Sequence, residues 1–79
     1  MSIIIYPTSL CGPCNHAKRL LKELNLMYKE IDIEEKGISR DALFEITGGR
    51  TVPQIIINDK PIGGYDDLIK YHRAGNLVA

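Results

Sequence analysis

The residues best suited to chemistry in this sequence are two cysteines, Cys11 and Cys14, which enclose Gly12 and Pro13. Cysteine thiolates attack disulfides and bind soft metal ions. A disulfide between these two residues would close a very short loop and would therefore stabilise the fold poorly. The pair is interpreted as a redox-active dithiol or as part of a metal site.

The segments beside the pair predict how its two sulfurs differ. An apolar run over residues 3–6 precedes it and is typical of a buried strand, and a helical pattern begins at Pro13. A C-x-x-C pair between a strand and a helix of a βαβ unit is typical of a thioredoxin-like redox motif. Unpaired N–H groups and the positive end of the helix dipole favour a thiolate at Cys11. We expect Cys11 to be the nucleophile and Cys14 to resolve the mixed disulfide.

Two other interpretations of the pair stay open. Zinc usually takes four protein ligands, and His16 and His72 would complete that number. His16 lies two residues after Cys14, on another face of the helix, which disfavours this site. Alternatively, both thiols are inert parts of the core. We favour redox chemistry and expect no metal.

The elements that position the cysteines follow from the hydrophobic pattern. The strand at 3–6 ends at Pro7, the helix runs from Pro13 to about Asn25, and a second strand covers 27–33. The helix has one apolar stripe with the spacing i, i+3, i+4 and i+7. This stripe consists of Ala17, Leu20, Leu21 and Leu24. In the second strand Ile31 and Ile33 would face inward, and Glu30 and Asp32 outward.

The rest of the chain predicts four further elements. Two are helices and two are strands, the latter joined by a turn at 58–60. The first helix runs from the N-cap Ser39 to Thr47 and ends at Gly48 and Gly49. The two strands cover 54–57 and 61–63. The last helix runs from Asp66–Asp67 to Gly75 and would be packed by Leu68, Ile69 and Tyr71. The order β-α-β-α-β-β-α predicts a mixed four-stranded sheet with helices on both faces.

Length and charge exclude several classes of protein. The 79 residues suit one domain, and ten basic residues balance ten acidic ones. Nucleic-acid binders usually carry a basic excess, and no apolar run reaches the ~20 residues of a membrane helix. The first residues show no basic segment or cleavage pattern of a secretory signal. We therefore expect a cytoplasmic protein that binds neither nucleic acid nor membranes.

Three motifs together resemble the glutaredoxin family. They are the Cys11–Cys14 pair, Thr-Val-Pro at 51–53 and Gly-Gly-Tyr-Asp-Asp-Leu at 63–68. The resemblance covers residues 1–79 as a single domain and implies the thioredoxin fold. The Gly-Pro dipeptide departs from the Pro-Tyr of classical glutaredoxins and is typical of thioredoxins. However, thioredoxins usually have a Trp before the first Cys, where this chain has Leu10.

The resemblance also implies a glutathione site. Pro53 would be a cis-proline against Cys11, leaving the backbone of Val52 free to pair with the cysteinyl unit. Arg40 would bind the glycyl carboxylate, while Thr8 stands at the usual lysine position. Arg50, Lys18 or His16 could partly replace that lysine, although each is more simply a surface charge. The implied glutathione residues are Arg40, Thr51, Val52, Gly64, Tyr65, Asp66 and Asp67, with Asp67 as the partner of the ammonium group.

The implied activity is glutathione-dependent reduction of protein disulfides and of glutathione mixed disulfides. We expect a monomer with glutathione as reductant. An alternative is a thioredoxin-like electron donor served by thioredoxin reductase, for example to ribonucleotide reductase. A third is a module that bridges a [2Fe–2S] cluster, as some relatives do with the first Cys and glutathione; only the space left by Gly12 favours it.

Overall fold

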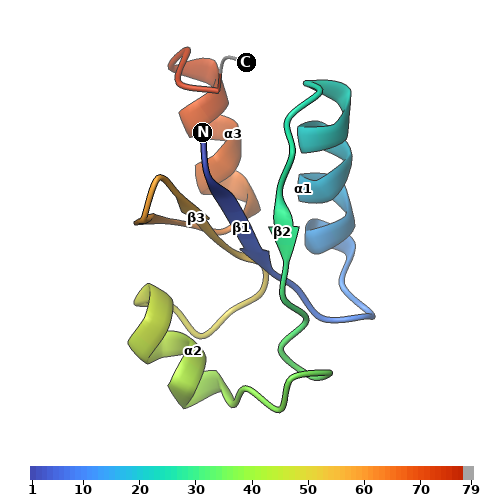
Figure 1. The fold of residues 1–79 in the computed structure, drawn as a ribbon, viewed down its shortest axis with the longest axis vertical. Coiled ribbons are helices and arrows are strands. Elements are labelled where there is room, and N and C mark those ends of the chain that lie inside the picture. The colour runs from blue at the N-terminus through green and yellow to red at the C-terminus, as the bar shows by residue number, and fades with distance from the viewer. Residues whose placement is uncertain (78–79) are drawn as a thin grey trace.

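The computed structural model describes residues 1–77 and shows three helices and four strands (Figure 1). Their order is the predicted one. The elements are β1 (Ile3–Tyr6), α1 (Gly12–Glu23), β2 (Lys29–Glu30), α2 (Arg40–Thr47), β3 (Gln54–Ile57), β4 (Lys60–Gly63) and α3 (Tyr65–Arg73). No helix among residues 1–77 combines the length and the apolar character that crossing a membrane requires.

The strands form one mixed sheet in the order β2-β1-β3-β4. β1 is parallel to β2 and antiparallel to β3, which in turn is antiparallel to β4. Side chains alternate between the two faces of a strand, so each central strand fills two apolar clusters. The first cluster contains Ile3, Ile5, Ile55 and Ile57 with Ala17 and Leu21 of α1 and Leu68 of α3. The second contains Tyr6, Ile4 and Ile56 with Leu43 of α2. The predicted sheet with helices on both faces is confirmed.

The predicted strand at 27–33 is wrong in its length, because β2 contains only Lys29 and Glu30. Pairing continues in a less regular form, with the N–H of Ile31 donating to Ile5 and that of Ile33 to Pro7. Pro7 has no N–H to donate in return, so the ladder cannot continue in both directions. Ile33 is nevertheless buried, as expected, whereas Ile31 is only half-buried.

The helix boundaries are set by the capping residues. Ser39 accepts a hydrogen bond from the N–H of Ala42, and Gly48 ends α2 in the left-handed region with φ 83°. α3 begins at Tyr65, one residue before the expected Asp66, because Gly64 is its N-cap. The N–H of Gly64 donates to Oδ2 of Asp67, 3.1 Å away, which fixes the start of this helix.

Candidate active site

Cys11 and Cys14 form a disulfide at the start of α1, with their Cα atoms 5.2 Å apart. Cys11 is the N-cap of the helix, and the N–H of Cys14 donates to its Sγ over 3.1 Å. Cys14 is completely buried, whereas Cys11 is half-buried. A thiol or thiolate arriving from solvent can therefore reach the sulfur of Cys11 but not that of Cys14. The same N–H would stabilise negative charge on Cys11 after reduction.

The loop at 51–53 brings a second chain segment against this sulfur. The Val52–Pro53 peptide bond is cis, and Pro53 is fully buried. The carbonyl oxygen of Val52 lies 3.8 Å from Sγ of Cys11. Backbone polar groups of residue 52 are thus adjacent to the redox centre, although the two segments are 41 residues apart in sequence.

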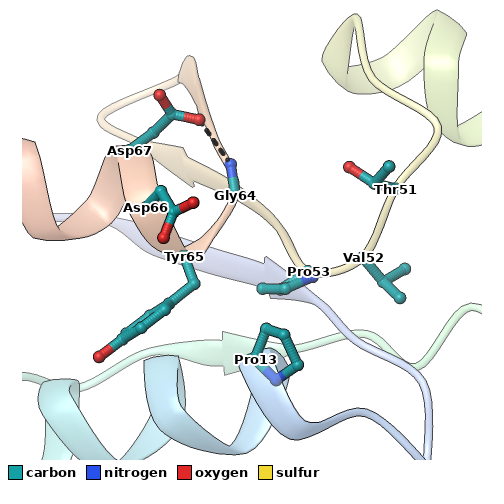
Figure 2. A pocket seen from close by; sticks show the side chains of 8 residues that line it. All are labelled: Pro13, Thr51, Val52, Pro53, Gly64, Tyr65, Asp66 and Asp67. Carbon is teal, nitrogen blue, oxygen red and sulfur yellow. Dashed lines mark hydrogen bonds between the residues drawn. The ribbon is translucent and has the colours of Figure 1, made fainter.

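A pocket of about 310 Å³ extends from this loop to the start of α3 (Figure 2). It joins Pro13 of α1 to the loop and to the first turn of α3. The lining residues are Pro13, Thr51, Val52, Pro53, Gly64, Tyr65, Asp66 and Asp67. The structure therefore gathers six of the seven predicted glutathione residues in one cavity, together with Pro13 and the predicted cis-proline Pro53. Arg40 and Thr8 do not line it.

Among the residues that line the pocket, only Asp66 and Asp67 have charged side chains. One oxygen of Asp67 already accepts the N–H of Gly64, so this residue acts as a cap as well as a wall of the pocket. The first N–H groups of a helix have no partner within it, and they attract anions. The start of α3 can therefore hold a carboxylate and an ammonium group side by side.

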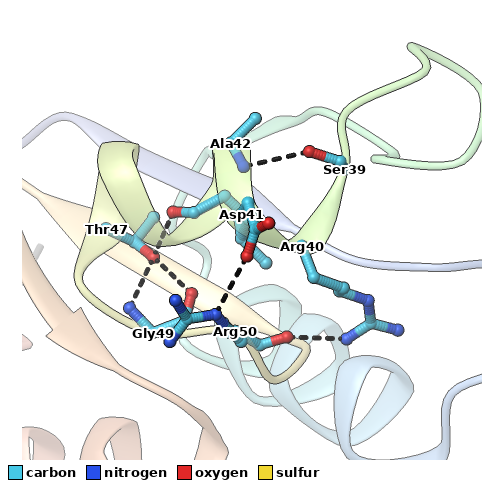
Figure 3. Close-up of polar contacts among 8 residues, drawn as sticks. Ser39, Arg40, Asp41, Ala42, Thr47, Gly49 and Arg50 are labelled. Carbon is cyan, nitrogen blue, oxygen red and sulfur yellow. Dashed lines mark hydrogen bonds and ion pairs between the residues drawn. The ribbon is translucent and has the colours of Figure 1, made fainter.

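Arg40 lies outside the pocket but touches the segment that leads into it. Its Nη1 donates to the carbonyl oxygen of Arg50 over 2.8 Å (Figure 3). Arg50 itself pairs with Asp41 at 3.2 Å, and its guanidinium group lies 4.1 Å from the ring centroid of Phe44. Both arginines are exposed and lie where α2 meets the loop, so the role of Arg40 toward a carboxylate stays a prediction.

The other residues considered for the missing lysine do not supply a cation to the pocket. Thr8, at the expected lysine position, is buried. Lys18 pairs with Glu30 at 3.0 Å, and the ring of His16 meets that of Tyr65 edge-on, with centroids 5.7 Å apart. No lysine, arginine or histidine lines the pocket. Among residues 1–77, the pocket therefore offers a ligand no side-chain cation, and the N–H of Cys14 is the backbone donor to the sulfur of Cys11.

The sequence analysis missed two residues that shape the loop. The side chain of Gln54 is buried, and its Nε2 donates to the carbonyl oxygen and to Oγ1 of Thr51. Gly49 packs against that amide, although its sequence signal indicated only the end of a helix. A single polar residue at the start of an otherwise all-isoleucine strand was the available signal for Gln54.

The zinc alternative finds no support in the described residues. No three side chains among His, Cys, Asp and Glu gather there as a metal site would require. His72, on α3, has a buried Nδ1 without a hydrogen-bond partner, but it does not line the pocket beside the cysteines.

Comparison with known proteins gives one consistent result. The Glutaredoxin family model matches residues 3–62. Human mitochondrial glutaredoxin-2 is 39% identical over 79 residues, covering 96% of this chain and 48% of the human protein. Rice chloroplastic glutaredoxin-C4 is 43% identical, covering 96% of this chain and 59% of that protein. The chain thus spans about half the length of these curated relatives.

Solved structures agree with the sequence relatives. A buckwheat glutaredoxin–glutathione complex superimposes with a TM-score of 0.85 at 34% identity, covering 95% of this chain and 71% of the other. A glutaredoxin from E. coli gives a TM-score of 0.77 at 30% identity, covering 95% of this chain and 96% of the other. The thioredoxin-like fold predicted from the sequence is confirmed.

Proposed function

The chain belongs to the glutaredoxin family, and from this premise we propose that it is a glutathione-dependent thiol–disulfide oxidoreductase. The observation that carries the proposal is the continuity of one pocket from the first turn of α3 to the loop beside Cys11. A tripeptide with a charged γ-glutamyl end and a central sulfur matches that arrangement. The buckwheat relative, whose structure is described as a complex with glutathione, supports the same ligand.

The γ-glutamyl and cysteinyl parts of glutathione each have a chemically suitable place in the pocket. The γ-glutamyl carboxylate suits the free N–H groups at the start of α3, and its ammonium group suits Asp66 and Asp67. The cysteinyl unit would pair with the backbone of Val52, as an added strand does. Its sulfur would then lie beside Cys11, because the Val52 carbonyl oxygen is 3.8 Å from Sγ of Cys11.

The reaction consists of two thiol–disulfide exchanges. The thiolate of Cys11 attacks the glutathione sulfur of a mixed disulfide, which breaks the S–S bond and releases the other partner as a thiolate. The resulting Cys11–glutathione disulfide is then attacked by a second glutathione, which leaves as oxidised glutathione and returns Cys11 to the thiolate. With a protein disulfide, Cys14 makes the second attack on the Cys11 mixed disulfide and the Cys11–Cys14 disulfide forms; two glutathione molecules then reduce it.

The glycyl end of glutathione is the least supported by the pocket. Arg40 is our candidate for the glycyl carboxylate; it lies outside the pocket, and its Nη1 already donates to the carbonyl oxygen of Arg50. Thr8 supplies no cation. We therefore expect recognition to depend more on the γ-glutamyl end than on the glycyl end.

One observation favours a second candidate, a thioredoxin-like donor reduced by thioredoxin reductase. The Gly12–Pro13 dipeptide leaves open space next to Cys11, since a Cβ at Gly12 would meet no atom within 4 Å. Such space would admit the surface of a large flavoenzyme.

The same space is the only feature that favours a bridged [2Fe–2S] cluster. Visible absorption after anaerobic purification would reveal that cluster.

A comparison of reductants on one oxidised sample separates the first two functions. NADPH, glutathione and glutathione reductase form one arm, and NADPH with thioredoxin reductase forms the other. The proposal expects fast turnover in the first arm. Fast turnover only in the second arm would overturn glutathione dependence and leave the dithiol chemistry intact.

The substrates, the oligomeric state and the location of the protein stay predictions. Protein disulfides and glutathionylated proteins are the expected substrates, with ribonucleotide reductase as one candidate, and we expect the protein to act as a monomer. The predicted cytoplasmic location is independent of the fold, because the relatives include mitochondrial and chloroplastic proteins.

A further inference from the structure

A buried amide supports the loop that lines the pocket. Gln54, at the start of β3, is only 4% exposed. Its Nε2 donates to the carbonyl oxygen of Thr51 over 2.9 Å and to Oγ1 of the same residue over 3.2 Å. Burying an amide is unfavourable unless it is hydrogen-bonded, so these two bonds hold the side chain and the loop in one arrangement.

These bonds determine which way the next backbone N–H points. The carbonyl group of Thr51 and the N–H of Val52 belong to one planar trans peptide, so they point in opposite directions. Since Gln54 holds the carbonyl oxygen on its own side, the N–H of Val52 points away from Gln54. Val52 lines the pocket, and its backbone is the group that we expect to pair with the cysteinyl unit.

Gly49 determines whether the amide of Gln54 can occupy this place. A Cβ at position 49 would lie 2.9 Å from Cδ and 3.0 Å from Oε1 of Gln54, closer than van der Waals contact allows. The atoms it would meet are the far end of a flexible side chain and not backbone. An alanine at 49 would therefore push the amide away from Thr51 with little other change. Gly49 is itself held by hydrogen bonds with Oγ1 of Thr47.

We propose that Gln54 is a positioning residue for substrate binding, which fixes the Thr51–Val52 peptide in the orientation that receives glutathione, and that Gly49 provides the space for its amide. This inference rests on the proposed function, because it assigns the Val52 backbone to glutathione. It links the end of α2 to the pocket through hydrogen bonds and packing among Thr47, Gly49, Gln54 and Thr51.

The test is a double-mutant cycle with the variants Gly49→Ala, Gln54→Ala and their combination. The substrate is the mixed disulfide of glutathione and mercaptoethanol, whose glutathionyl part would occupy the pocket, and its KM and kcat are measured at saturating glutathione. We expect each single variant to raise KM about tenfold with kcat within twofold, the loss of about one well-formed hydrogen bond. In the Gln54→Ala background, Gly49→Ala is expected to change KM less than twofold, because the amide it displaces is gone.

Three controls separate positioning from general damage. Gln54→Met keeps the volume of the side chain without its donors and should reproduce the KM effect. Ile57→Val weakens the core at the other end of β3 and should leave KM unchanged. Reduction of the Cys11–Cys14 disulfide by dithiothreitol, which has no γ-glutamyl group, should proceed equally in all variants.

The possible failures are distinguishable. If wild-type protein shows no saturation with this mixed disulfide, the proposed function is overturned, and this inference with it. If wild-type protein saturates but Gly49→Ala and Gln54→Met keep its KM, only the positioning role is overturned. Additive effects of Gly49→Ala and Gln54→Ala on KM would overturn the role assigned to Gly49.

Discussion

Two helix N-termini, those of α1 and α3, face the same pocket with different electrostatics. Pro13 in the first turn of α1 and Tyr65 in the first turn of α3 both line it. The first turn of α1 has no acidic residue, and its N-cap is the sulfur of Cys11. The first turn of α3 contains Asp66 and Asp67, and its N-cap is a glycine.

This difference shows that a helix N-terminus can serve two purposes. A helix N-terminus stabilises negative charge through its free N–H groups and its dipole. In α1 the charge it favours belongs to the protein, on the attacking sulfur. In the proposed function, α3 leaves its first N–H groups to the ligand, and its two carboxylates add a preference for an ammonium group. We therefore expect α1 to determine reactivity and α3 to determine which thiol is accepted.

The largest expected effect comes from removing the N-cap sulfur of α1. Cys11→Ser should abolish reduction of glutathione mixed disulfides, because no other thiol of the chain is accessible. Cys14→Ser should retain that activity and lose most reduction of protein disulfides, since only the latter needs a resolving thiol. Steady-state assays with both substrates measure this. Equal activity of the two variants would contradict the assigned roles.

The next largest effect comes from the carboxylates of α3. Asp67→Ala should raise KM for a glutathione mixed disulfide about tenfold, through the loss of one charge-assisted contact. It should also destabilise the fold by about 1 kcal/mol through the lost cap. Asp66→Asn should raise KM less and leave stability unchanged. Asp59→Asn, in the turn before β4, is the matched control for charge and should alter neither value. Unchanged KM in both pocket variants would show that α3 does not select the thiol.

A smaller effect should follow from making α1 resemble α3. Asn15→Asp adds an exposed carboxylate near the start of α1. Such a charge, four residues after Cys11, would disfavour a second negative charge there, and like-charge pairs at this spacing cost about 0.2–0.5 kcal/mol. The thiolate of Cys11 should therefore form at higher pH, which ultraviolet absorbance against pH would detect, and the effect should shrink in high salt. Asn15→Gln is the uncharged control, and an equal shift in both variants would exclude the electrostatic cause.

The smallest expected effect belongs to a side-chain cation outside the pocket. Lys18→Ala removes the 3.0 Å ion pair with Glu30, and exposed pairs of this kind contribute about 0.2–1 kcal/mol to stability. We expect KM for a glutathione mixed disulfide to change less than twofold. A larger rise in KM would mean that Lys18 leaves Glu30 to meet the ligand, and the helix ends would then not be its main source of positive charge.

The sequence predicted the parts of this molecule that depend on local pattern. The isoleucines of β1 and β3, the cap at Ser39 and the left-handed Gly48 all follow from residue type and spacing. The length of β2 was not predicted because it depends on its neighbour, where Pro7 interrupts the exchange of hydrogen bonds. A strand pattern describes one chain segment and contains no information about its partner.

The candidate site divides in the same way. The pair at Cys11 and Cys14 follows from its motif, and the residues at 51–53 and 64–67 were implied by resemblance to a family. Gln54 was missed because its hydrogen bonds to Thr51 need the space that Gly49 leaves, and the sequence assigns Gly49 to the end of another element. Arg40 shows the converse, since resemblance placed it at the ligand and the structure shows it bonded to the backbone of Arg50.

The most direct test of the account is the NMR spectrum of the Cys14→Ser protein carrying glutathione on Cys11, compared with the same protein carrying mercaptoethanol. Both adducts have a disulfide at Cys11, so the difference between them reports the rest of the tripeptide. We predict that the amide resonances of Val52, Gly64 and the first turn of α3 differ between the two adducts. Differences confined to the neighbours of Cys11 would contradict a pocket in which α3 holds the γ-glutamyl end.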